Sequence, residues 1–156
     1  MSNIDTAKLF FGVVLNKLQD SFPTAISLSS ADLWPEFERV AKGRTLSIKT
    51  RERSYQTLQV SDLAENQALQ AHYTKLMLSW MKAEGFLVSD PTSGFIYDYV
   101  LSSKALAALN IPIEKEKRTI GEALATAARK TGDAAQSELI GLLVERIFDY
   151  FPRLTP

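Results

Sequence analysis

Apolar residues recur along the chain at two different spacings, and the spacing distinguishes helices from strands. Helical spacing predicts a first helix over Asp5–Phe22, a second over Ala31–Ala41, and further helical segments over 61–84, 104–109 and 120–150. The first helix has a wide apolar arc. Such an arc is typical of a helix that is covered on more than one side, so we expect this helix in the core.

The predicted second helix has recognisable start and stop signals. Ser29 or Ser30 precedes it and offers a side-chain oxygen to the free amides of the first turn. Gly43 follows its last apolar residue, as expected of a glycine that ends a helix. Proline deep inside a helix removes a hydrogen bond and clashes with the preceding turn. Pro35 is therefore expected either to sit in the first turn or to break the helix.

Between these helical segments the period changes from helical to alternating. Leu46 and Ile48 alternate with polar residues, and so do Leu58 and Val60. Alternation of this kind predicts two half-buried strands. We expect an inserted hairpin around residues 44–60, with its turn near residues 51–54.

A second pair of strands is expected directly after the helical segment 61–84. The run Glu84–Val88 ends that helix at a glycine and continues as a strand. Residues 90–94 contain proline and glycine in the order typical of a turn, and Phe95–Leu101 is predicted as the returning strand. Ser102 or Ser103 is then expected to cap the short helix over 104–109. This order of elements predicts a small wing attached to the preceding helix.

The C-terminal segment begins with a charged connector and continues as helix. Thr119–Glu122 has the spacing of a capping box, in which a threonine hydroxyl and a glutamate carboxylate cover the free amides of a helix start. The helix is expected to reach about Tyr150, with a possible break at Thr131–Asp133. Small residues, beginning at Gly121, indicate close helix packing. This segment either covers the first helix or forms a dimer interface with it.

Two stretches of the chain resemble the winged helix-turn-helix superfamily. Leu78–Val88 is similar to the end of a recognition helix that runs into the first wing strand, and Tyr99–Leu109 is similar to the second wing strand and the helix after it. Val60–Glu65 looks like the entry to the preceding helix of that motif. One possibility is that residues 62–84 contain both helices of the motif. The alternative is that they form a single helix, and the helix over Ala31–Ala41 is then the other helix of the motif.

The resemblance implies a mainly α fold with a small antiparallel β wing, that is, an α+β protein with a winged-helix core flanked by N- and C-terminal helices. It covers roughly residues 60–110. We expect a winged-helix-like domain over residues 1–112, with the hairpin as an insertion, and a helical extension over residues 113–156. Winged helices bind either double-stranded DNA or another protein, and the fold alone does not choose between them.

Composition restricts the class of protein further. The 156 residues suit one domain of ordinary size, and 46% of them are hydrophobic. The chain contains no cysteine, which suits a reducing compartment and leads us to expect a cytoplasmic protein. Its longest apolar run near the start, Leu9–Leu15, is much shorter than the roughly 20 residues of a membrane span. The net charge is zero, which counts against a dedicated nucleic-acid binder.

Motifs for catalysis or metal binding are not found in the sequence. His72 is the single histidine, and its expected place is the exposed side of a helix. A metal site or a serine–histidine pair would depend on that one imidazole. The glycines are scattered and form no phosphate-binding loop. We therefore expect a protein without enzymatic activity, metal or cofactor.

The strongest charge feature is a basic cluster opposed locally by a single acid, Glu52. Segregated charge of this kind attracts phosphates even at zero net charge, although a solvated hairpin would show it too. The hypothesis is a DNA-binding regulator, either monomeric or dimeric, with phosphate contacts from the cluster and base contacts from the helix that follows. The alternative is a protein-interaction module. The residues expected to contact nucleic acid are Arg39, Lys42, Arg44, Lys49, Arg51 and Arg53 in the cluster and Gln67, Gln70, His72, Thr74 and Lys75 on the helix.

Overall fold

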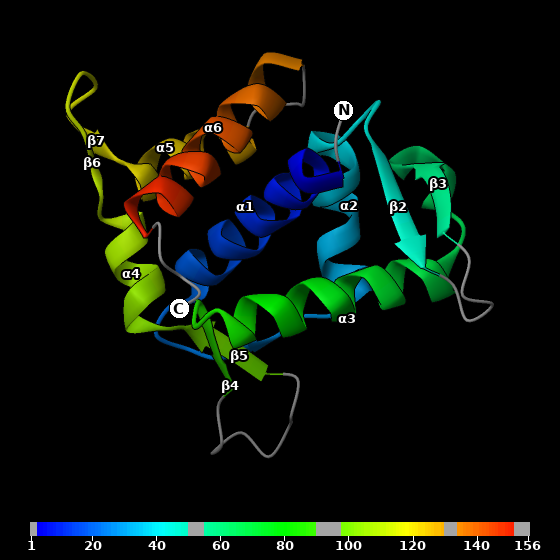
Figure 1. Ribbon diagram of the computed structural model, residues 1–156. Helices are drawn as coiled ribbons and strands as arrows, with labels where there is room; N and C mark the ends of the chain where they lie inside the picture. Colours follow the sequence, from blue (N-terminus) through cyan, green and yellow to red (C-terminus); the bar gives the residue numbers. More distant parts are fainter. Residues whose placement is uncertain (1–2, 50–54, 90–97, 130–133, 152–156) are drawn as a thin grey trace.

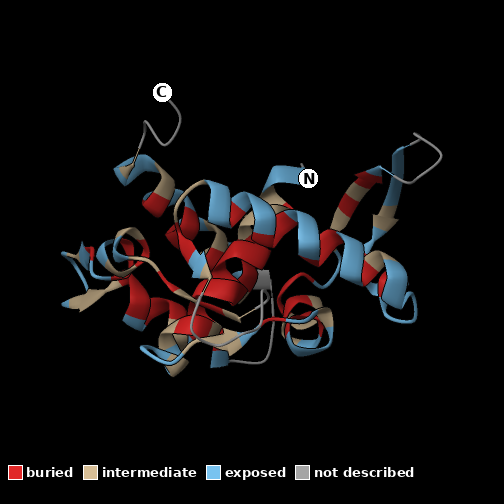
Figure 2. Ribbon diagram, turned by 90° about the horizontal axis from the view of Figure 1, so that it is seen from below, coloured by how far each residue is buried: buried red, intermediate tan, exposed pale blue. Residues whose placement is uncertain are grey.

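The first helix is the centre of the molecule. The computed structural model describes residues 3–49, 55–89, 98–129 and 134–151. Helix α1 (Asn3–Ser21) contacts four later helices and one strand from each of two separate sheets. Its side chains from Leu9 to Leu15 are all buried, and Figure 2 shows that the buried residues gather in the middle of the molecule. The prediction of a helix covered on more than one side is confirmed.

Two groups of aromatic rings fill the core on either side of α1. Phe10 meets the rings of Phe37 and Tyr73 at centroid distances of 5.0 and 5.4 Å. Phe11 meets the rings of Phe86 and Phe148 at 4.9 and 5.0 Å. Because Phe10 and Phe11 are consecutive in the helix, they point to different sides and join the two halves of the core.

Helix α2 (Ser30–Val40) begins as the sequence predicts. Ser29 is its N-cap, and a capping box joins Ser29 to Asp32. The prediction for Pro35 is wrong, since this residue is the sixth of the helix and the helix continues through it. The lost backbone hydrogen bond is offset by burial of the apolar side chains that follow in the helix, Phe37 and Val40.

The inserted hairpin is confirmed, with strands β2 (Thr45–Lys49) and β3 (Tyr55–Gln59) paired antiparallel. Its predicted turn lies outside the described residues. Leu46 and Ile48 face the core, whereas β3 is largely exposed and projects at one end of the molecule (Figure 2). Two side chains of α1 hold the outer edge of β2: the Asn3 amide exchanges hydrogen bonds with the backbone of Ser47, and the Thr6 hydroxyl donates to the carbonyl of Thr45 at 2.6 Å.

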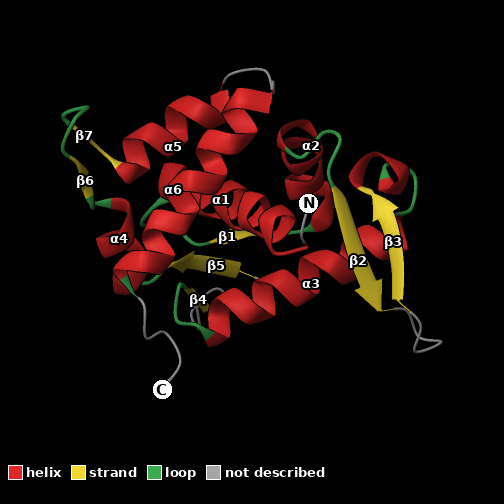
Figure 3. Ribbon diagram, turned by 45° about the horizontal axis from the view of Figure 1, so that its top comes forward, coloured by secondary structure: helices red, strands yellow, loops and turns green. Residues whose placement is uncertain are grey.

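After the hairpin comes a single α-helix rather than two. A short 3-10 turn (η1, Val60–Leu63) leads to helix α3 (Gln67–Ala83), which Asn66 caps through its side-chain oxygen. Residues 62–84 therefore contain one α-helix, and α2 is the α-helix that precedes it in the chain. The hairpin and the small three-stranded sheet lie at the two ends of α3 (Figures 1 and 3).

The three-stranded sheet contains the predicted wing strands. Strand β4 (Leu87–Ser89) pairs with β5 (Asp98–Leu101), and β5 also pairs with the short strand β1 (Ile26–Ser27), all antiparallel in the order β1-β5-β4. Gly85 enters β4 with a φ of 85°, a conformation that glycine adopts without strain. The wing turn and the first half of the predicted second strand lie outside the described residues.

The C-terminal segment packs back onto α1. Ser102 caps helix α4 (Ser103–Leu109). A small hairpin of β6 (Pro112–Ile113) and β7 (Arg118–Thr119) lies where the sequence predicts a charged connector. The remaining two elements both contact α1: they are the helices α5 (Ile120–Arg129) and α6 (Ala134–Tyr150).

The capping box at the start of α5 is also confirmed. The Glu122 amide donates to the Thr119 hydroxyl, and the Thr119 amide donates to the Glu122 carboxylate, both at 3.2 Å. The possible break at 131–133 lies outside the described residues. A dimer through the first and last helices remains a prediction, but much of the apolar face of α6 is used within one chain, where Ile140, Val144 and Ile147 are buried.

The fold is thus mainly α with small antiparallel sheets, as the sequence predicts. Within the described part of the chain, no helix has the length and apolar character that crossing a membrane requires.

Candidate nucleic-acid interface

The described members of the predicted basic cluster do not lie together at one place. Arg39 lies on the inner side of α2, where its guanidinium donates to the carbonyl of Ala128 at 2.5 Å, in the last turn of α5. A cation is favourable at the carboxyl end of a helix, where carbonyl groups lack partners. Arg39 therefore joins α2 to α5, and its predicted contact with nucleic acid stays a prediction.

The other described members of the cluster lie at opposite ends of β2. Lys42 and Arg44 lie in the turn before the strand, and Lys49 is its last residue, roughly 17 Å further along at the usual rise of an extended chain. The Lys49 ammonium is 5.9 Å from the centroid of the Tyr55 ring, across the hairpin. Arg51 and Arg53 lie outside the described residues. The described basic residues of the cluster are therefore spread from α2 to the far end of β2.

Two of the predicted base-contacting residues face inwards. The amide of Gln70 is buried and donates to the carbonyls of Leu63 and Ala64 at 2.6 and 3.0 Å, which ties α3 to the turn before it. Thr74 is also buried. Neither side chain is placed to reach a base edge, because both lie on the core face of α3. The signal was present in the sequence: Gln70, Thr74 and the buried Met77 share helical spacing.

The other three predicted residues on α3 are exposed. Gln67, His72 and Lys75 lie on the outer side of the helix, with small side chains such as Ala71 between them. Helix α3 contains no aspartate or glutamate and carries two lysines. Its outer side is therefore basic at neutral pH and offers no carboxylate that would repel a phosphate.

A hollow of about 360 Å³ lies beside this exposed side of α3 and was not anticipated from the sequence. It separates α3 from the junction between β1 and α2. The residues that line it include four serines and one lysine. The lining residues are Ser27, Leu28, Ser29, Ser30, Ala71, Thr74, Lys75, Leu78, Ser79 and Tyr99.

The amino end of α2 opens at this hollow. Within the described chain, the backbone amides of Ser30 and Ala31 have no hydrogen-bond acceptor. Free amides and the helix dipole make such an end favourable for an anion. The carboxylate of Asp32 also lies at this amino end of the helix. It accepts a hydrogen bond from the Ser29 hydroxyl at 2.7 Å, which holds the pKa of Asp32 below its ordinary value.

Thr74 adds a further polar group to the wall of the hollow. Its hydroxyl is buried and has no hydrogen-bond partner among the residues that the structure describes. A buried hydroxyl without a partner is costly, by about 1–3 kcal/mol. The free amides, the serine hydroxyls and Lys75 can satisfy the oxygens of an anion such as phosphate, whereas the Thr74 hydroxyl lies behind this surface.

No metal-binding or catalytic constellation accompanies this surface in the part of the chain that the structure describes. No group of three or more histidine, aspartate or glutamate side chains converges there. His72 stands on the exposed side of α3, as expected from the sequence. Comparison of the chain with protein-family models, curated proteins and solved structures finds no match.

Proposed function

We propose that the chain is a winged-helix nucleic-acid-binding protein that contacts duplex DNA with the outer side of α3 and the amino end of α2. The order of elements supports this proposal. Strands β4 and β5 follow α3 directly as a wing, and β1, which precedes α2, pairs with β5 in the same sheet. The sheet and α2 therefore flank α3 while leaving its outer side exposed.

The observation that carries the proposal is the hollow between the amino end of α2 and Lys75. Phosphate contacts commonly use lysine, serine hydroxyls, backbone amides and helix amino termini. Residues that line the hollow carry groups of these kinds: the Lys75 ammonium, the hydroxyls of Ser30 and Ser79, and the backbone amide of Ser30 at the amino end of α2. A phosphate seated there would place α3 against the neighbouring groove of the duplex.

The outer side of α3 suits entry into a major groove. Ala68 and Ala71 are small, so the helix backbone can approach the base edges closely. Gln67 is able to pair with an adenine edge, and His72 and Lys75 are able to donate to guanine or phosphate. These residues replace the wider set predicted from the sequence, because Gln70 and Thr74 are buried.

Equilibrium binding to a mixed-sequence duplex across a salt series tests the proposal. We expect binding that weakens steeply as salt rises, because phosphate contacts release counterions. Lys75→Ala should weaken binding and lower the magnitude of the salt slope by about 1, whereas Lys115→Ala, on the exposed turn of the β6–β7 hairpin, should leave both unchanged. Absence of binding at low salt would overturn the proposal.

A second candidate function is protein recognition through the adjoining side of α3. Leu76 and Trp80 are one helical turn apart and remain 50% and 40% exposed. Exposed apolar neighbours of this kind occur at interfaces, and a net charge of zero presents no obstacle to a protein partner. If DNA binding fails, Leu76→Ser should abolish association with such a partner, whereas Lys75→Ala should not.

A further inference from the structure

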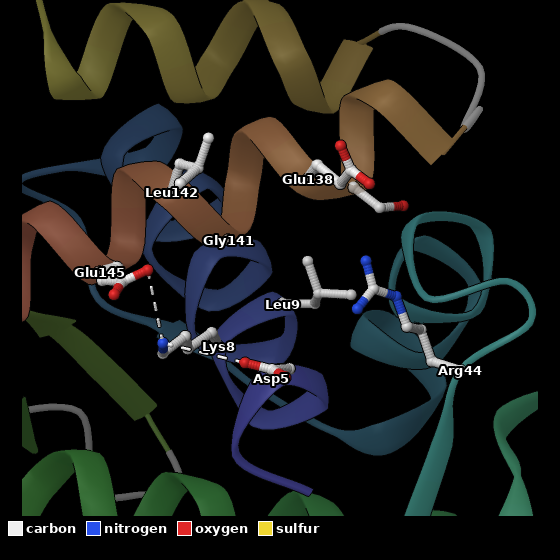
Figure 4. Close-up of a pocket in the computed structure, with 9 residues that line it drawn as sticks. Asp5, Lys8, Leu9, Arg44, Glu138, Gly141, Leu142 and Glu145 are labelled. Carbon is white, nitrogen blue, oxygen red and sulfur yellow. Dashed lines mark ion pairs between the residues drawn. The ribbon is translucent and has the colours of Figure 1, made fainter. Parts of the chain in front are cut away.

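A separate groove lies between α1, α6 and the residue that precedes β2 (Figure 4). Its volume is about 240 Å³, below the roughly 300–1,000 Å³ typical of sites for drug-sized ligands, so it suits a metabolite of amino-acid size. No residue of α3 lines it. The lining residues are Asp5, Lys8, Leu9, Arg44, Ser137, Glu138, Gly141, Leu142 and Glu145.

One cation of the groove is already neutralised. The ammonium of Lys8 lies 4.0 Å from the Asp5 carboxylate and 3.8 Å from the Glu145 carboxylate, and its side chain is mostly buried. Figure 4 shows this lysine between its two acids, on the side of the groove away from Arg44. Lys8 therefore has its counter-charges within the protein.

Arg44 and Glu138, in contrast, have no such counter-charges among the residues that the structure describes. No hydrogen bond or ion pair joins the half-buried Arg44 side chain to any described residue, and the same holds for the carboxylate of Glu138. They come from different walls, Arg44 from the start of the hairpin and Glu138 from α6, and the Arg44 guanidinium extends into the groove towards α6 (Figure 4). A free cation and a free anion thus lie on opposite walls.

Gly141 keeps the space between these charges open. It lies in the middle of α6, where glycine costs roughly 0.5–1 kcal/mol relative to alanine. A Cβ atom at this position would meet nothing within 4 Å, so packing inside the chain does not require the glycine. The missing side chain leaves the groove unfilled next to two apolar residues, Leu9 on its floor and the exposed Leu142 at its rim.

We propose that this groove binds a free α-amino acid with an aliphatic side chain. The Arg44 guanidinium receives the α-carboxylate, and the Glu138 carboxylate receives the α-ammonium. The aliphatic side chain lies over Gly141 against Leu9 and Leu142. Guanidinium–carboxylate pairs are among the strongest hydrogen-bonded contacts in proteins, and the two walls match the two opposite charges of the ligand.

Such a ligand would act at the base of the hairpin. The carbonyl of Arg44 accepts a hydrogen bond from the amide of Val60 at 2.9 Å, which closes the two strands next to the groove. A ligand that binds the Arg44 side chain therefore fixes the start of β2 relative to α6. The site does not depend on DNA binding, because the two surfaces share no residue.

Calorimetric titration of the full chain with L-leucine, L-valine and L-methionine tests the proposal. We expect at least one of them to bind with a dissociation constant of about 1 mM or tighter. The leucine analogues 4-methylpentanoate, which lacks the ammonium, and 3-methylbutylamine, which lacks the carboxylate, should each bind at least tenfold more weakly. Equal binding of either analogue would overturn the assignment, as would the absence of both binding heat and a melting-temperature shift for all three amino acids.

Variants locate the site. Arg44→Ala and Glu138→Gln should each weaken binding at least tenfold, and Gly141→Leu should abolish it by filling the groove. Lys115→Ala is the control and should bind as the wild type does. Circular dichroism melts verify that each variant is folded. Unchanged affinity in the folded Arg44→Ala and Gly141→Leu variants would show that the amino acid binds elsewhere and would overturn the proposal.

Discussion

Gly12 of α1 and Ile140 of α6 lie so close together that a Cβ atom on Gly12 would be 2.7 Å from the Cγ2 atom of Ile140. Two helices approach this closely only where one of them lacks a side chain. The contact holds the C-terminal segment against the central helix. Packing at Gly12 therefore decides how α6 is seated, and with it the groove in which Arg44 and Glu138 face each other.

The first prediction follows from that contact. Gly12→Ala should lower the free energy of unfolding by roughly 1–3 kcal/mol, because the extra methyl group enters a filled core. Gly141→Ala is the matched control on the partner helix, where a methyl group meets nothing, and it should raise the free energy of unfolding by up to about 1 kcal/mol. Denaturant titration measures both. A neutral Gly12→Ala variant would contradict the close approach.

Arg39 is predicted to stabilise the fold. Arg39→Ala should reduce the free energy of unfolding by roughly 1.5–3 kcal/mol, because the carbonyl of Ala128 at the end of α5 loses its charged donor. Lys42→Ala, at an exposed position three residues later, should change it by less than about 0.5 kcal/mol. Thermal melts compare the two. A similar small effect for both would mean that Arg39 does not join α2 to α5.

Tyr73 carries a hydroxyl that the core does not satisfy. Burial raises the pKa of Tyr73 well above its ordinary value, and its Oη atom has no partner in the described chain. Tyr73→Phe should therefore raise the free energy of unfolding by about 1 kcal/mol, while the stacked ring contact with Phe37 at 5.8 Å is kept. Tyr55→Phe on the exposed strand β3 should have no effect. Destabilisation by Tyr73→Phe would indicate a hydrogen bond to a group outside the described residues.

The capping box of α2 makes a pH-dependent contribution. The Ser29 hydroxyl is the main cause of the lowered pKa of Asp32. A lowered pKa means that the charged form is favoured in the folded chain. The charged Asp32 carboxylate makes its full contribution to the free energy of unfolding above the ordinary aspartate pKa of about 3.9. This contribution is lost as the pH falls through the pKa of Asp32 in the folded chain. The stability difference between wild type and Asp32→Ala should therefore be constant near neutral pH and shrink in acid. A difference that grows on acidification would contradict this reading.

Much of the fold follows from signals that act over a few residues. The capping boxes at Ser29 and Thr119, the turn at Gly85 and the alternation around Leu46 each depend on neighbours in sequence, and each is where the sequence predicts it. Pro35 is the exception, because burial of the residues around it outweighs its local cost. Capping residues, turn residues and apolar spacing were sufficient to predict an element wherever burial against distant residues did not oppose them.

The site was predicted less completely, because its residues are brought together by packing over long distances. The role of Arg39 depends on Ala128, 89 residues later in the chain. Ser30 and Lys75 both line the hollow, although the inserted hairpin separates them in the sequence. The amphipathic pattern of α3 could have shown that Gln70 is buried, but its polarity favoured an exposed position. The sequence alone did not show which face of each helix packs against which other element.

Chemical-shift mapping of the backbone amides during titration with a mixed-sequence duplex at low salt tests whether α3 binds nucleic acid. We expect the largest shifts on Ser30, Ala71, Lys75 and Ser79, which line the hollow between α2 and α3, while Gly141 and Lys115 stay unchanged. Shifts confined to α6 or the β6–β7 hairpin, or a spectrum that does not change at any DNA concentration, would contradict nucleic-acid binding through α3.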